Sequence, residues 1–85
     1  MDDRDLTAAF EAHKQTAPLG EHGKRMFTRR IAITLADMAD ISVKSLVHRC
    51  ERLGLCKPGA WNWFRQNGGF TKEHFEQTRN ERRSI

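Results

Sequence analysis

The stretch TLADMADISVKSLVHRCERLGL, residues 34–55, decides the fold. It contains two segments of helical periodicity, and each follows a residue whose side chain can cap a helix. These caps are Thr34 for the first segment, with Asp37 at the capping-box position, and Ser42 for the second. Apolar residues flank both caps at the spacing of a hydrophobic staple, Ile33 with Met38 and Ile41 with Leu46. The sequence therefore predicts two short helices joined by a tight turn.

Apolar residues give each of these two helices one face that must be buried. On the second helix, Leu46, Cys50 and Leu53 recur at i, i+4 and i+7, so Cys50 is expected to be a core residue and not a reactive thiol. The inward-facing residues expected on the first helix are Leu35, Met38 and Ala39, with the small Ala36 where the helices approach each other closely.

At the turn between the two helices, Asp40 takes a position that favours left-handed backbone, and Ile41 is expected to anchor the turn in the core. With the small residue at 36, the cap at Ser42 and the RLGL ending, residues 34–55 resemble the helix-turn-helix regulators of bacteria and their phages, which prefer Gly at the position of Asp40. The resemblance implies an all-α small helical bundle with a central helix-turn-helix, and we expect one domain over residues 1–85. It also implies a cytoplasmic transcriptional regulator of phage or mobile-element origin, acting as a homodimer on double-stranded DNA.

In such proteins the N-terminal part of the second helix enters the major groove. Residues 42–52 are therefore the expected reading helix, with Val43, Lys44, Val47, His48 and Glu51 on its outward face. Lys44 and His48 can donate to acceptor edges of bases, and the two valines can meet a thymine methyl group. The remaining expected contacts are Ser42 and Ser45 near the helix start, and Arg49 and Arg52 to phosphate.

The block KRMFTRR, residues 24–30, precedes this motif and carries four cations, Lys24, Arg25, Arg29 and Arg30. It is either a patch or arm that contacts phosphate, or a solvated basic face. Residues 24–33 fit a short helix, which we favour, or an extended arm. The net charge of +4 agrees with an anionic partner.

The flanking segments predict further helices. Residues 3–16 have helical spacing and can be capped by Asp2 or Asp3, and residues 71–83 can be capped by Thr71 with Phe70 and Phe75 as a staple. Residues 1–16 and 71–83 are both candidate dimer interfaces. Residues 57–69 favour a short helix, with Pro58 in its first turn and Gly68 at its end, whereas the alternative makes Asn67-Gly68 the turn of a short wing.

A second hypothesis is a small phage-type module that binds or inhibits a host protein through Val43, Val47 and an exposed Trp63, while Trp61 and Phe64 fill the core. RNA binding is a third hypothesis, permitted by the charge but supported by no RNA-binding motif. The phrase ISVKSLVHRCERLGL is also similar to a segment that follows the peptidase region of phage immunity-control metallopeptidases. No H-E-x-x-H motif accompanies it here, so it implies no enzymatic activity.

Several other classes of protein do not fit the sequence. There is no nucleophile with a neighbouring base and no phosphate-binding glycine loop, so we expect no enzyme and no cofactor. The four His and two Cys match no usual zinc spacing, and two cysteines do not make a disulfide-stapled secreted domain. No apolar run is long enough for a membrane span, and the acidic start does not resemble a signal peptide. We therefore expect no metal and no membrane partner.

Overall fold

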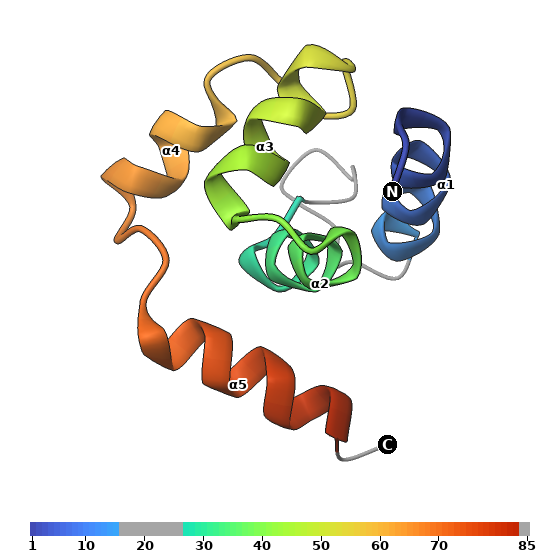
Figure 1. Ribbon diagram of the computed structural model, residues 1–85. Coiled ribbons are helices and arrows are strands. Elements are labelled where there is room, and N and C mark those ends of the chain that lie inside the picture. Colours follow the sequence, from blue (N-terminus) through green and yellow to red (C-terminus); the bar gives the residue numbers. More distant parts are fainter. Residues whose placement is uncertain (16–26, 84–85) are drawn as a thin grey trace.

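The computed structural model describes residues 1–15 and 27–83, and in these ranges the chain forms five α-helices and no strand (Figure 1). The helices are α1 (Asp3–Lys14), α2 (Arg29–Ala39), α3 (Val43–Arg52), α4 (Ala60–Gln66) and α5 (Lys72–Arg83). The all-α prediction is confirmed. The alternative of a β wing at residues 57–69 is wrong, because that segment forms α4 as the favoured interpretation predicted.

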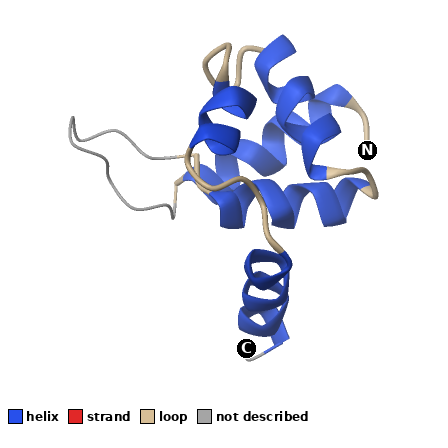
Figure 2. Ribbon diagram, turned by 90° about the vertical axis from the view of Figure 1, so that its left-hand side faces the viewer, coloured by secondary structure: helices blue, strands red, loops and turns tan. Residues whose placement is uncertain are grey.

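Helix α2 is the centre of the molecule, since α1, α3 and α5 all pack against it, while α4 packs against α3. Figure 1 looks almost along α2, with α3 crossing it, and Figure 2 shows α5 projecting from the other helices. The buried core residues are Leu6, Phe10, Ile31, Ala32, Ile33, Leu35, Ala36, Val43, Leu46, Val47, Cys50 and Phe64. Each of the first four helices contributes to this core, so the position of α3 is fixed by packing on two sides.

Helix α2 begins earlier than the sequence predicted. Its N-cap is Thr28, whose hydroxyl accepts a hydrogen bond from the Ile31 N–H at 3.3 Å. The predicted cap, Thr34, lies inside the helix and is buried, so that prediction is wrong. The physical reason is that residues 31–36 are all buried. Because packing in the core stabilises a helix, the helix includes these residues and begins before Thr34.

The last turn of α2 corrects two more predictions. Burial stops at Ala36, and Met38, expected to face inward, is 50% exposed. Asp37 has no capping-box role, because the helix starts at Arg29. Its carboxylate instead accepts two hydrogen bonds from Arg79 of α5, at 3.1 and 3.2 Å, and so ties α5 to α2.

The turn between α2 and α3 consists of residues 40–42 and agrees with the prediction. Asp40 is left-handed, with φ 56° and ψ 44°. The Ile41 N–H donates to the Ala36 carbonyl at 3.1 Å and the Asp40 N–H to the Asp37 carbonyl at 3.3 Å, which is the Schellman pattern that ends a helix. Ile41 packs against the core, and the Ser42 side chain accepts from the Ser45 N–H at 3.1 Å to begin α3.

The other helix ends also have identifiable causes. Asp2 caps α1 by accepting from the Asp5 N–H at 2.8 Å, and Thr71 caps α5 by accepting from the His74 N–H at 3.3 Å, both as predicted. Pro58 does not lie in the first turn of α4, because the N-cap is Gly59. At the other end of α4 the chain turns through positive φ at Gly68. Helix α1 ends at Lys14, and Thr16 lies outside the described residues.

Candidate nucleic-acid interface

The outward surface of α3 is polar over its N-terminal half. Lys44, Ser45 and His48 are all exposed, and their i, i+1, i+4 spacing places them on one side of the helix. The first turn of α3 carries no acidic residue, so the partial positive charge of the helix N-terminus is not neutralised there. These three predicted contact residues are therefore brought together and left accessible.

The two valines predicted to lie beside them are buried instead. Val43 is 7% exposed and Val47 is 0% exposed, and both belong to the core. The inward face of α3 consists of Val43, Leu46, Val47 and Cys50, at the spacing i, i+3, i+4, i+7. The predicted face, Leu46, Cys50 and Leu53, was narrower and lacked both valines. The prediction that the valines meet a thymine methyl is wrong, because both are buried in the core. For the same reason they do not form a protein-contact surface with Trp63, which is exposed as predicted.

The serines at the start of α3 have a structural role. The Ser42 hydroxyl accepts from the Ser45 N–H at 3.1 Å and donates to the Ser45 hydroxyl oxygen at 2.9 Å. Both side chains remain exposed at the helix end. Ser42 is therefore committed to capping, whereas the Ser45 hydroxyl can still donate to a ligand.

Glu51, predicted to lie on the outward face of α3, has a structural role. Its carboxylate accepts hydrogen bonds from the Gly59 N–H at 3.3 Å and the Trp61 N–H at 3.0 Å, and so satisfies the N-terminus of α4. The His48 ring lies beside it, with Nδ1 3.8 Å from Glu51 Oε1 and its centroid 5.9 Å from that of Trp61. Glu51 thus links α3 to the N-terminus of α4 and lies beside the His48 ring. The missed signal was Gly59, which offers no side-chain cap of its own.

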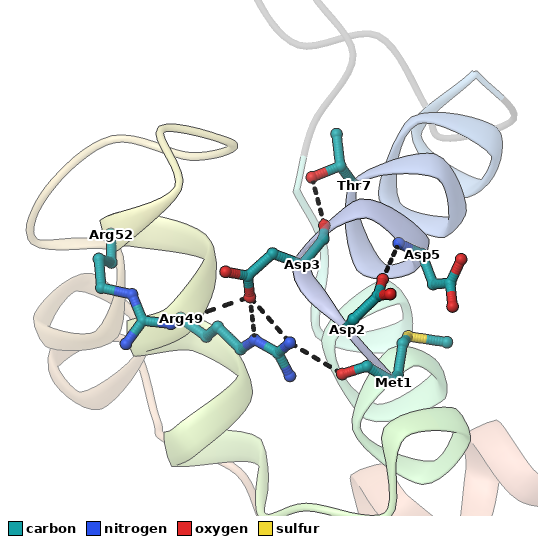
Figure 3. Close-up of polar contacts among 7 residues, drawn as sticks. All are labelled: Met1, Asp2, Asp3, Asp5, Thr7, Arg49 and Arg52. Carbon is teal, nitrogen blue, oxygen red and sulfur yellow. Dashed lines mark hydrogen bonds and ion pairs between the residues drawn. The ribbon is translucent and has the colours of Figure 1, made fainter.

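The two arginines in the second half of α3 face the first turn of α1 (Figure 3). Arg49 donates a hydrogen bond from Nε to Oδ1 of Asp3 at 2.8 Å, and its Nη2 atom lies 2.8 Å from the same oxygen. Nη2 also donates to the Met1 carbonyl at 2.8 Å. Arg52 Nη2 lies 3.9 Å from the same Asp3 oxygen. The predicted phosphate contacts therefore already hold an anionic group of this chain.

In the described part of the basic segment 24–30, the two arginines contact different helices. Arg29 donates from Nε to the Gly69 carbonyl at 2.8 Å and from Nη2 to the Asn67 carbonyl, and its guanidinium lies over the ring of Phe64. Its donors thus cap the end of α4, which corrects its assignment as a phosphate contact. Arg30 pairs with Glu81 of α5 at 3.2 Å. Lys24 and Arg25 lie outside the described residues.

Cys50 is buried and Cys56 is partly buried. Burial raises the pKa of Cys50 to about 12 and that of Cys56 to about 11, so both thiols are protonated near neutral pH. Within residues 1–15 and 27–83, no three His, Cys, Asp or Glu side chains gather as a metal site. In the same ranges, every helix is too short or too polar to cross a bilayer.

No protein-family model, curated protein or solved structure matches this chain.

Proposed function

We propose that this chain is a helix-turn-helix protein that binds double-stranded DNA, with α2 and α3 as the motif and the N-terminal half of α3 in the major groove. The observation that carries the proposal is the joint exposure of Lys44, Ser45 and His48 on a helix whose opposite face is fully buried. A helix held in this way presents its outward side chains in a fixed orientation, as readout of base edges requires.

The dimensions support this use of α3. Its ten residues span about 15 Å, and the major groove of B-DNA is wide enough to admit a helix. The three-residue connection at positions 40–42 has the length typical of a helix-turn-helix. A homodimer would place two copies of α3 on half-sites about one helical turn apart, with α1 and α5 as candidate interfaces.

The chemistry of the exposed side chains favours guanine. In α3, which is described throughout, every apolar side chain is buried, so none is available for a thymine methyl. Lys44, Ser45 and His48 can instead donate hydrogen bonds, and guanine presents two acceptors, N7 and O6, in the major groove. We therefore expect the bound sites to contain guanine at the positions that face Lys44 and His48.

The proposal is tested by fluorescence anisotropy with labelled duplexes, first a random pool and then the sequences selected from it. We expect binding that weakens steeply with salt, because each neutralised phosphate releases counterions. Lys44→Ala is expected to reduce discrimination against a duplex without guanine by about tenfold or more. Lys72→Ala is the matched control, because it removes the same charge from a highly exposed position on α5.

Two outcomes would contradict the proposal. One is the absence of binding to the random pool at low salt. The other is an equal loss of affinity in Lys44→Ala and Lys72→Ala, which would reduce the interaction to nonspecific attraction by net charge. A host protein captured after nuclease treatment, in the absence of DNA binding, would favour the protein-interaction hypothesis.

A further inference from the structure

Arg49 and Arg52 direct guanidinium nitrogens at one carboxylate oxygen. Asp3 Oδ1 is 2.8 Å from both Nε and Nη2 of Arg49 and 3.9 Å from Nη2 of Arg52 (Figure 3). All three side chains are accessible, with exposed fractions of 21% for Arg49, 70% for Arg52 and 53% for Asp3. The two arginines thus form an oxyanion site at the edge of α3, and the oxyanion in it comes from α1.

We propose that this is a binding site for a phosphate of the DNA backbone, and that Asp3 occupies it in the free protein. The inference rests on the proposed DNA-binding function and adds that Asp3 competes with a DNA phosphate for the two arginines. A phosphodiester oxygen has the same charge and the same hydrogen-bond acceptor character as the carboxylate oxygen it would replace. Asp3 therefore lowers the affinity for DNA, and its side chain leaves the site when a duplex docks on α3.

The surroundings of Asp3 allow this exchange without unfolding. Helix α1 is held in the core by Leu6 and Phe10, both fully buried, and its N-terminus is capped by Asp2. Asp3 is in the first turn, ahead of both core residues, and a rotation of its side chain moves neither. The Asp3 side chain is about half exposed, so the closely spaced phosphates of a duplex can reach the arginines and displace it.

The test measures the duplex affinity of Asp3→Asn against salt concentration by fluorescence anisotropy, with the selected duplex. We expect affinity about twofold to fivefold higher than that of the unchanged protein at low salt. The slope of log affinity against log salt should change by less than about one unit, because the duplex displaces Asp3 and the same phosphates are neutralised in both proteins. The matched control is Asp5→Asn, which removes an equal charge from the same turn of α1 without touching the arginine pair.

A second measurement separates competition from a structural role of the ion pair. Urea unfolding should show Asp3→Asn slightly less stable than the unchanged protein, although it binds DNA more tightly. Equal DNA affinity in Asp3→Asn and Asp5→Asn, with the unchanged protein still binding DNA, would overturn this inference alone. Reduced DNA affinity in Asp3→Asn would overturn it as well. The absence of binding in all three proteins would instead mean that the proposed function has failed.

Discussion

Replacing Arg29 with alanine tests whether this arginine stabilises the fold through specific contacts or is only a surface cation. Its guanidinium connects the start of α2 to the loop after α4, through hydrogen bonds to the carbonyls of Gly69 and Asn67. It also lies over the rings of Phe64 and Phe70, with centroid distances of 5.4 and 5.9 Å. Removing the side chain leaves those carbonyls without their charged donor.

The expected loss follows from these contacts. The partly buried hydrogen bond to Gly69 contributes about 1.5 kcal/mol, the low end for a charged donor, and the exposed one to Asn67 about 0.5–1 kcal/mol. The cation–π contacts add about 0.5–1 kcal/mol. We therefore expect Arg29→Ala to lower the free energy of unfolding by about 3 kcal/mol. Arg29→Lys keeps the charge but not the two-pronged geometry, and should lose about half as much.

The assay is urea unfolding followed by tryptophan fluorescence, since Trp61 and Trp63 lie in the same aromatic cluster. With a slope of about 1 kcal/mol per molar urea for a small domain, the midpoint should fall by about 3 M. The matched control is Arg30→Ala, an equal charge change at the next residue, whose ion pair with Glu81 is exposed and contributes less than about 0.5 kcal/mol. Equal destabilisation by the two substitutions would refute the capping role of Arg29.

Three further predictions concern the turn, the second capping contact and the thiols. Asp40→Gly should stabilise the protein by about 0.5–1 kcal/mol, measured by thermal unfolding, because Gly adopts positive φ without strain. Glu51→Ala should cost about 1–2 kcal/mol in urea unfolding, because α4 loses its N-terminal acceptor, and an unchanged midpoint would contradict this. The pKa values of Cys50 and Cys56 are raised from the ordinary 9.0, so the folded state binds more protons than the unfolded state above pH 9.0. Stability should be fully present below that pH and fall as pH rises towards 11 and 12, with a shallower fall in Cys56→Ala.

Much of the fold could be predicted because helix boundaries have local signals. The caps at Asp2, Ser42 and Thr71 and the left-handed residue Asp40 all depend on side chains within four residues of the helix end. The start of α2 could not be placed in this way, because Thr34 satisfies the local cap pattern although the N-cap is Thr28. Burial of residues 31–36 by the neighbouring helices extends the helix past Thr34 towards Thr28.

The candidate site was predicted less completely, because its limits depend on contacts between distant segments. Lys44 and His48 are exposed as expected, but the packing of α4 on α3 was not anticipated, and both valines are buried with the core. Arg29 pairs with residues about forty positions away, and Arg49 with Asp3 at a separation of 46. A local charge pattern shows that a residue is cationic but cannot show which partner already holds it.

The central claim is that α3 binds duplex DNA with its N-terminal half, and an NMR titration of the isotopically labelled protein tests it most directly. A selected duplex is added stepwise, and the amide chemical shifts are followed for every residue. We expect the largest changes to cluster at Ser42–His48 and to extend to Arg49 and Arg52, with the amides of α5 nearly unmoved. No change on saturation, or changes centred on α5, would contradict it.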